Sequence, residues 1–398
     1  MKFAHPTKFS SVVLPIILLT VFISTQALAA GGHYYARQAP WGGLLDTEKL
    51  LADDIRQAFV QQKAEAPTVD KLLVPLARYK AKQIAALSKN ELMAESKQDL
   101  KPLLLEAGVG DDLYASAFIK ADNAQKLANA FAKWATKKSS GGWTNLGLGV
   151  FESGGKCTGF VILTNRPLKL KPLPRKVFKD RKLWIEGYMK EGKLPSVYMA
   201  RPDRFVERYE LKRLATGGFA LSIELSEPGT HLVQIVAQDK SGPKSIATMP
   251  VDYEGRHRKS WVPRPEKMDA PDSAKVMDNT FLWLSKLRRG FSLSCLKSDR
   301  ALSEAARRFA REMAAGQFFR HSTASESSTD RIARSGLHYK RFGENLARGS
   351  DPAMMLNKLW QSPVHRYNLM DKGFNRVGLG AAQNERGQWY LVMLFGEK

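Results

Sequence analysis

The last third of the sequence holds three side chains whose types could do chemistry together, His321, Glu344 and His365. They lie in the segments FFRHS, FGENLARG and WQSPVHRYNLM, which are well separated along the chain. Neutral imidazole and carboxylate groups are the donors that suit a borderline divalent ion such as Zn²⁺. The residue types therefore predict a metal site or, with Glu344 acting as a general base, a metal-assisted hydrolase.

Each of these residues also has a purely structural interpretation. His365 and Arg366 follow a Ser-Pro break and could hydrogen-bond to the backbone to hold that turn. Glu344 could accept backbone N–H bonds that fix a Gly-Glu-Asn loop, and His321 could cap the preceding helix. The serines beside the two histidines suggest a Ser-His-Glu triad, but adjacency in sequence says little about triad geometry. The neighbours that we expect to support the site are Asn345, Ser362 and Arg366.

The hydrophobic pattern divides the chain into three domains. Residues 30–168 begin with helices and end with two strands around the turn ESGGK, which is an α+β pattern. The basic, Pro-containing stretch 169–181 predicts an extended linker. Short alternating runs over 182–254 predict a small immunoglobulin-like β-sandwich. A second linker, 255–271, leads to a C-terminal domain over 272–398 that begins with helices and ends with two strands.

A repeat relates the two outer domains. The segments NLGLGVFESGGKCTGFVILTN and RVGLGAAQNERGQWYLVMLFG align without a gap, and each follows a helix that carries a Trp. A chance match of two hairpins is the alternative, but a repeat at this scale predicts two domains of one fold. The first copy lacks the segment SPVHR, and it has no His between Tyr35 and Cys157. We therefore expect the first copy to be a structural or binding domain without the His/Glu site.

The N-terminus predicts secretion. MKFAHPTKF supplies a short basic region, SSVVLPIILLTVFIS is an apolar run, and TQALAA places small residues at the cleavage positions Ala27 and Ala29. This is the pattern of a signal peptide over residues 1–29. A transmembrane anchor is the weaker interpretation, because the run is short and is broken by Pro15. We therefore expect a secreted or periplasmic protein with no membrane anchor after signal cleavage.

Charge indicates the kind of partner. The 398-residue chain has a formal net charge of +23, which suits anionic envelope or cell-wall components. The basic residues are spread along the chain without a long Lys/Arg tract or a nucleic-acid motif, so we do not expect a nucleic-acid partner. Lipid and protein partners stay open.

Two cysteines, Cys157 and Cys295, lie in different predicted domains. In an oxidising compartment they could form a disulfide that staples the two domains together. The alternative is two free thiols.

The C-terminal domain resembles the CAP superfamily (sperm-coating protein, antigen 5 and pathogenesis-related family), and most of all its short secreted bacterial branch. The resemblance rests on an ordered series: a leading helix, FFRH, DRIARSG, GENLARG, W-x-x-SP-x-HRYNLM, a GLG strand and the strand WYLVMLFG. It covers the chain from about Asp272 to the C-terminus. Each motif alone is weak, and their order and spacing make the resemblance specific.

The resemblance implies a three-layer α-β-α sandwich at the C-terminus, with a divergent CAP-like α+β copy at the N-terminus. It also implies a cavity lined by two His and two acidic residues that holds a divalent metal in several members. His321, Glu344 and His365 match three of those positions. The second acidic position has no counterpart, since the nearby Asn357 and Gln361 cannot ionise.

Enzymatic activity is not a general property of CAP domains. The resemblance therefore favours a binding protein for a metal, lipid, cell-wall or protein ligand. The alternative is a metal-dependent hydrolase in which Glu344 is the catalytic base.

Overall fold

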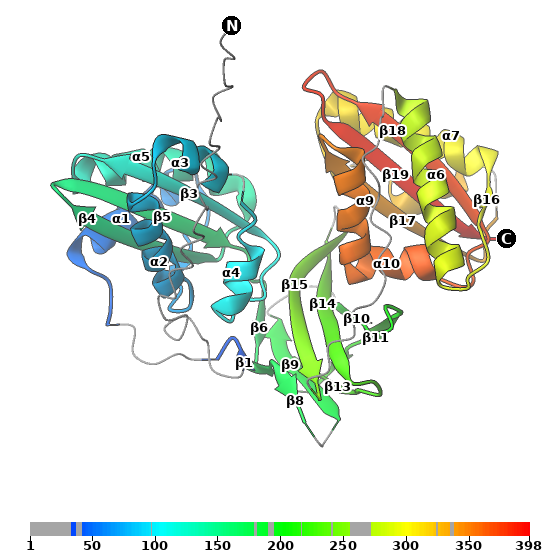
Figure 1. Cartoon of the computed structure of the whole chain (residues 1–398), viewed down its shortest axis with the longest axis horizontal. Coiled ribbons are helices and arrows are strands. Elements are labelled where there is room, and N and C mark those ends of the chain that lie inside the picture. Colours follow the sequence, from blue (N-terminus) through cyan, green and yellow to red (C-terminus); the bar gives the residue numbers. More distant parts are fainter. Residues whose placement is uncertain are drawn as a thin grey trace, which may run out of the picture.

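The structure is a computed structural model, and it describes ten stretches of the chain. These are residues 33–36, 42–96, 98–178, 181–189, 195–215, 217–239, 242–254, 272–323, 325–334 and 338–398. The expected signal peptide and the expected linker 255–271 lie outside them. Two α/β domains flank a β-sandwich, so that the sandwich lies between them (Figure 1). Within the described stretches, no helix is both long and apolar enough to span a bilayer.

The C-terminal domain is built on one four-stranded sheet, in the order β16-β18-β19-β17. β16 runs parallel to β18, and the other neighbours are antiparallel. The strands are β16 (Lys297–Ser298), β17 (Arg341–Gly349), β18 (Arg376–Gln383) and β19 (Trp389–Glu397).

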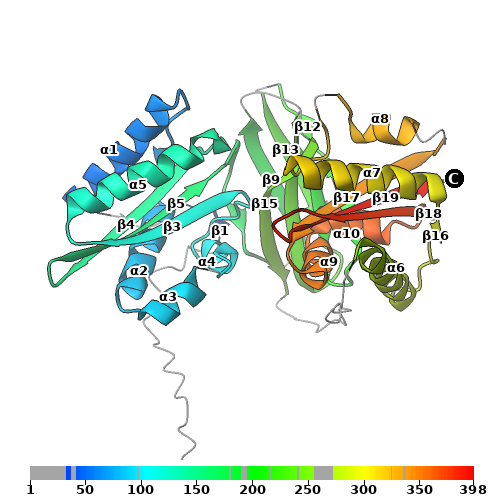
Figure 2. The ribbon, with the colours of Figure 1, turned by 90° about the horizontal axis from the view of Figure 1, so that it is seen from above.

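Helices cover both faces of this sheet and complete three layers (Figure 2). One face carries α6 (Ser273–Gly290), α9 (Pro352–Gln361) and α10 (Pro363–Met370). The other carries α7 (Arg300–Gly316) and α8 (Ser328–Ala333). Pro363 occupies the first position of α10, where its missing N–H costs no hydrogen bond. His365 therefore lies in the first turn of a short helix.

Two glycines of β18 let α7 approach the sheet closely. A Cβ added to Gly378 would lie 2.2 Å from the backbone carbon of Leu302, and one added to Gly380 would lie 2.2 Å from that of Ala306. Asp299 caps the same helix by accepting a 3.2 Å hydrogen bond from the N–H of Leu302. The two glycines of the GLG sequence are thus required for the close packing of α7 on β18.

The sheet of the N-terminal domain has the same order and the same strand directions as that of the C-terminal domain. Its order is β2-β4-β5-β3, with β2 parallel to β4 and the other pairs antiparallel. The strands are β2 (Thr68–Val69), β3 (Tyr114–Ala121), β4 (Asn145–Ser153) and β5 (Lys156–Thr164). One face carries α1 (Asp46–Gln61) and α5 (Ala124–Lys138), and the other carries α2 (Leu73–Ala85), α3 (Lys89–Glu95) and α4 (Lys101–Glu106).

The packing of helix on sheet also repeats. A Cβ on Gly147 would lie 2.4 Å from the Cβ of Leu73, and one on Gly149 would lie 2.2 Å from the backbone nitrogen of Arg78. Asp70 accepts a 2.7 Å hydrogen bond from the N–H of Leu72 at the start of α2. Between α5 and β4 the chain forms only the 3₁₀ turn η2 (Ser139–Gly141), where the C-terminal domain has α10.

The middle domain consists of two sheets packed face to face. One has the order β11-β10-β14-β15-β8 and the other the order β12-β13-β9-β6. A buried apolar cluster drawn from both sheets fills the space between them. The strands are β6 (Leu168–Leu170), β8 (Lys176–Val177), β9 (Lys182–Met189), β10 (Ser196–Ala200), β11 (Val206–Glu210), β12 (Lys212–Arg213), β13 (Gly218–Glu224), β14 (Gly229–Asp239) and β15 (Gly242–Tyr253).

The stretch 169–181, expected as a linker, is largely part of this sandwich. It contributes the end of β6, the strand β8, and β7 (Leu173–Pro174), which pairs with β1 (His33–Tyr34). Leu173 and Val177 are buried in the sandwich core, as is the preceding Leu168. Apolar residues alternate with Lys here, and that alternation outweighs the Pro content.

Both outer domains contact the sandwich. On the N-terminal side, Asp112 accepts hydrogen bonds from Lys101 of its own domain and from Ser245 and Thr248 of β15. On the C-terminal side, Tyr198 of β10 packs edge-to-face on Tyr367 of α10, with ring centroids 5.5 Å apart. The sandwich is therefore a joint between the two α/β domains.

Candidate functional site

The structure brings His321 and Glu344 together. His321 follows α7, and its Nδ1 lies 2.8 Å from Oε1 of Glu344. Glu344 lies within β17, opposite Leu394 of β19, and not in the loop that the sequence suggested. The GEN segment forms a strand because its backbone pairs with β19 along its whole length. The side chain of Glu344 is 3% exposed and that of His321 is 15% exposed, so the hydrogen bond between them is well shielded from water.

Arg331 of α8 completes the group, and sequence reasoning assigned it no role. Its Nη2 donates to Oε2 of Glu344 at 3.1 Å and to the backbone oxygen of His321 at 2.6 Å. Its Nη1 donates to Glu326 at 3.1 Å, and its guanidinium carbon lies 3.4 Å from the ring centre of Phe309. The side chain is fully buried, so both oxygens of Glu344 are held in a paired, buried network.

His365 lies next to this network but outside it. Asn345 of β17 donates from Nδ2 to the backbone oxygen of His365 at 2.9 Å, which ties the sheet to α10. Asn368 in turn donates to Oδ1 of Asn345 at 2.8 Å. Desolvation, and second the nearby His321, lower the pKa of His365 to about 4. Its imidazole is therefore neutral at pH 7, and its buried Nδ1 has no hydrogen-bond partner among the described residues.

These residues do not fit a three-ligand zinc site as they stand. Both carboxylate oxygens of Glu344 are occupied by His321 and Arg331, and the buried guanidinium adds a positive charge where a cation would bind. Among the residues that the structure describes, no group of three or more His, Cys, Asp or Glu side chains is placed to hold a metal ion. Glu344 instead occupies the place of a carboxylate that orients an imidazole.

The other two expected supporting residues, Ser362 and Arg366, face the joint with the sandwich. The Oγ of Ser362 donates to Oε1 of Gln234 at 3.3 Å, and the N–H of Val364 donates to the same oxygen at 2.8 Å. Arg366 donates from Nε to the carbonyl of Trp360 at 2.7 Å, and its guanidinium carbon lies 4.6 Å from the ring centre of that Trp. The backbone-holding interpretation of Arg366 is what the geometry shows.

The sandwich also reaches His321 itself. Gly242 begins β15 at the tip of the β14–β15 hairpin, and a Cβ added there would lie 2.5 Å from the Cβ of His321. The candidate site thus lies against a second domain. Only contacts between distant segments create this arrangement, so no local sequence pattern could have indicated it.

Strand register identifies the corresponding place in the N-terminal domain. Ser116 of β3 pairs with Ile162 of β5, as Glu344 pairs with Leu394, and the glycines Gly147 and Gly378 pair with the same two partners. By this register Ser116 stands where the C-terminal domain has Glu344. A hydroxyl therefore replaces the carboxylate that anchors the histidine.

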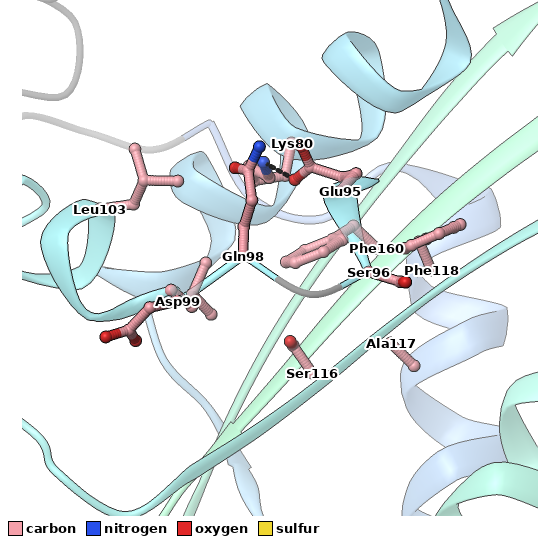
Figure 3. A pocket seen from close by; sticks show the side chains of 11 residues that line it. Lys80, Glu95, Ser96, Gln98, Asp99, Leu103, Ser116, Ala117, Phe118 and Phe160 are labelled. Atoms are coloured by element: carbon pink, nitrogen blue, oxygen red, sulfur yellow. Dashed lines mark hydrogen bonds and ion pairs between the residues drawn. The ribbon is translucent and has the colours of Figure 1, made fainter. Parts of the chain in front are cut away.

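A cavity of about 250 Å³ lies at this place (Figure 3). Ser116, Ala117 and Phe160 line it from the sheet, and Lys80 and Glu95 form a buried ion pair at its edge. Neither imidazole nor free carboxylate lines the sheet side of this cavity in the described residues. The N-terminal domain thus has a cavity at this place, without the His/Glu chemistry.

Both cysteines are free thiols in the structure. Cys157 is buried on β5, and Cys295 is exposed after α6. Burial raises the pKa of the Cys157 thiol, with Glu152 as a smaller cause. The interdomain disulfide that the sequence allowed is not formed, because one cysteine lies in each outer domain and the sandwich separates those domains.

Comparison with known protein families gives a match within the C-terminal domain. The model of the cysteine-rich secretory protein family, CAP, matches residues 284–395. The uncharacterized protein YkwD of Bacillus subtilis is 29% identical over 118 residues, which is 29% of this chain and 46% of that relative. This chain therefore spans less than half of that relative's length.

Similar solved structures share low sequence identity with this chain. An outer surface protein of Borrelia burgdorferi is 21% identical, with 32% of this chain and 96% of that chain covered and a TM-score of 0.31. An extracellular protein containing an SCP domain from Bacillus anthracis is 17% identical, with 55% of this chain and 82% of that chain covered and a TM-score of 0.29. Together, the family model and the relative identify the C-terminal region of this protein, residues 284–395, as a CAP domain of the cysteine-rich secretory protein family.

Proposed function

We propose that this is a secreted or periplasmic binding protein without enzymatic activity. In this proposal the CAP domain offers the region around His321, Glu344 and His365 to a ligand, and the sandwich fixes how that region is presented. The observation that carries the proposal is the complete pairing of Glu344, whose two oxygens bind His321 and the buried Arg331. A carboxylate whose two oxygens are both bonded to protein partners in this way is oriented as a structural group, and neither oxygen is left unpartnered as a base would be.

The hydrolase alternative lacks a suitable base. A general base works best when it is free to accept a proton and has a pKa near the working pH. Glu344 would have to leave Arg331 or His321, which would strand a buried charge or an imidazole. His365, with its pKa lowered to about 4, accepts protons poorly at pH 7. Both features favour binding over catalysis.

Zinc binding by the imidazoles of His321 and His365 stays a prediction. In that arrangement Glu344 would orient His321 and would not bind the metal itself. Zinc would supply a Lewis-acidic centre, and the two imidazoles are fewer than the three protein ligands of typical catalytic zinc sites.

We also propose that the N-terminal domain is a divergent copy of the CAP fold. The shared strand order, strand directions and paired glycines support this proposal. Ser116 in place of Glu344, and the missing counterpart of α10, make it a structural or separate binding domain.

That the sandwich is immunoglobulin-like stays a prediction, and its two packed sheets are compatible with it. Anionic envelope or cell-wall components remain the partners that the net charge of +23 favours.

The test compares wild-type protein with Glu344→Gln on panels of ester and peptide substrates, with metal analysis of both. We expect no turnover above the blank for either protein. Turnover by the wild type that Glu344→Gln abolishes would refute the proposal, provided that circular dichroism shows the variant to be folded.

Secretion is tested separately by fractionation and N-terminal sequencing of the mature protein, which we expect to begin at residue 30. A mature chain that retains the apolar N-terminal run would contradict that part.

A further inference from the structure

A pocket of about 170 Å³ lies between the sandwich and the CAP domain, apart from the His321–Glu344 pair. Three arginines line it: Arg201 and Arg204 from the loop between β10 and β11, and Arg366 from α10. Neither domain alone encloses this pocket, since each supplies part of the lining. Such a concentration of guanidinium groups in one small pocket needs an explanation.

Arg366 is the key residue because it is a buried cation. It is 3% exposed, and its Nε is used by the carbonyl of Trp360. No carboxylate among the described residues forms an ion pair with it, and the charged group that most affects it is another cation, Arg204. Burial and Arg204 lower the pKa of Arg366 to about 9, so the guanidinium still carries its charge at neutral pH. Buried charges in proteins are normally paired, because an unpaired one is costly.

The loop that carries Arg204 is held in a defined shape. Arg204 has φ of +78°, in the left-handed region that side chains other than Gly rarely adopt. Its N–H donates to the carbonyl of Arg201 at 2.9 Å, and Asp203 accepts a 2.9 Å bond from the N–H of Phe205. Phe205 packs edge-to-face on Phe291 of the CAP domain, with ring centroids 6.0 Å apart. The CAP domain thus anchors the loop beside Arg366.

Arg201 differs from Arg366 because its charge is compensated. It contacts Asp203 at 2.5 Å and Glu207 at 3.2 Å, and these two carboxylates hold it in place. Neither carboxylate lines the pocket, whereas Arg201 does. Arg366 therefore brings to the pocket a buried positive charge that no carboxylate among the described residues pairs with.

We infer that this pocket binds the phosphoryl group of an anionic ligand, gripped by Arg366 from the CAP domain and by Arg204 from the sandwich. Guanidinium groups present parallel N–H donors that match the oxygens of phosphate. A phosphoryl group has enough oxygens to serve two guanidinium groups and carries up to two negative charges, whereas a carboxylate has two oxygens and one charge. This site goes beyond the proposed function, because it uses none of the residues of the His321–Glu344 network.

The experiment is calorimetric titration of the full-length mature protein at low salt with inorganic phosphate, glycerol phosphate and acetate. We expect saturable one-to-one binding of both phosphates, weaker binding of acetate, and loss of affinity as NaCl is raised. Vesicles with and without an anionic phospholipid form a further arm. Vesicle binding that requires Arg204, without binding of soluble glycerol phosphate, would assign the phosphoryl group to a lipid.

Arg204→Asn is the decisive variant, because Asn tolerates the left-handed backbone that the loop requires. We expect it to weaken phosphate binding at least about tenfold, which is the usual weight of a charge-assisted hydrogen bond. Arg213→Asn removes the same charge from an exposed position on β12 outside the pocket and should bind like wild type. Arg366→Met should abolish binding, and its folding is checked separately because Arg366 packs on Trp360.

Two results would overturn the inference. One is no saturable binding of any phosphate, soluble or in vesicles, by the folded wild-type protein. The other is equal loss of affinity in Arg204→Asn and Arg213→Asn, which would mean that the overall charge attracts the anion and that the pocket does not.

Discussion

Replacement of Gln234, a residue of the sandwich, by Leu should weaken the attachment of α10 of the CAP domain to the sandwich. No side chain of its own segment caps the N-terminus of α10, since Ser362 makes no capping hydrogen bond. Instead Oε1 of Gln234, on β14 of the sandwich, accepts bonds from the N–H of Val364 and the hydroxyl of Ser362. Leu has nearly the same size as Gln but cannot accept a hydrogen bond, so Gln234→Leu removes the cap with little change in packing.

The size of the effect follows from the groups that lose a partner. Gln234 is 4% exposed, so water cannot readily replace its oxygen. Loss of an N-terminal cap costs about 1 kcal/mol, and a buried donor left without a partner costs about 1–3 kcal/mol. The amide of Gln234 also donates to Thr248 at 3.1 Å, and this bond is lost as well. We therefore expect the free energy of unfolding to fall by roughly 2 kcal/mol.

Hydrogen exchange followed by mass spectrometry, together with urea denaturation, measures this directly. Peptides that cover α10 should exchange faster in Gln234→Leu, while peptides from α7 should be unchanged. Gln238→Leu, at an exposed position on the same strand, is the matched control and should behave like wild type. If α10 exchanges equally in wild type and Gln234→Leu, and the urea midpoint does not move, the sandwich does not cap this helix and the reasoning fails.

Three further predictions concern the CAP domain. Glu344→Gln should lower the free energy of unfolding by about 3 kcal/mol, because Arg331 loses a buried counter-charge; urea denaturation checks this, and a change below about 0.5 kcal/mol would contradict it. His365 has a lowered pKa, so the unfolded chain binds its proton first and stability should fall by roughly 2–3 kcal/mol as pH drops from about 6.5 to 4. Thermal melts should show a smaller loss in that window for His365→Gln, and equal losses would refute the assignment. Gly380→Ala should cost about 1–3 kcal/mol, since its Cβ would meet the backbone of Ala306; an unchanged melting temperature would show that α7 can move away.

The sequence predicted those features that leave a local pattern. Hydrophobic periodicity predicted the leading helices and the two closing strands of the C-terminal domain but not β17, and the GLG repeat includes the glycines that contact α7 and α2. The motif series identified the CAP domain that the family model confirms. The periodicity and the glycine signals arise within one helix, one strand or one turn, and the motif series is a succession of such local signals in a fixed order.

The sequence did not predict features that depend on distant partners. Arg331 appeared in the sequence only within the DRIARSG motif, without a role of its own, and only the fold buries it against Glu344 and Phe309. The stretch 169–181 was interpreted as a linker because its Pro and Lys content outweighed the alternation that places Val177 in the sandwich core. The capping role of Gln234 has no signature in its own strand, since Ser362 and Val364 lie more than a hundred residues away.

The contact of Gly242 with His321 has a consequence for how related sequences diverge. The tip of the hairpin can sit against His321 only because position 242 carries no side chain, and its φ of +110° also disfavours any residue with one. Proteins that fuse this sandwich to a CAP domain should therefore keep Gly at this position for as long as the two domains stay docked. A CAP domain without this hairpin would not place that restraint on the segment that carries its histidine. Covariation between the hairpin tip and the histidine segment would then record, in sequence alone, which family members hold the two domains in the same arrangement.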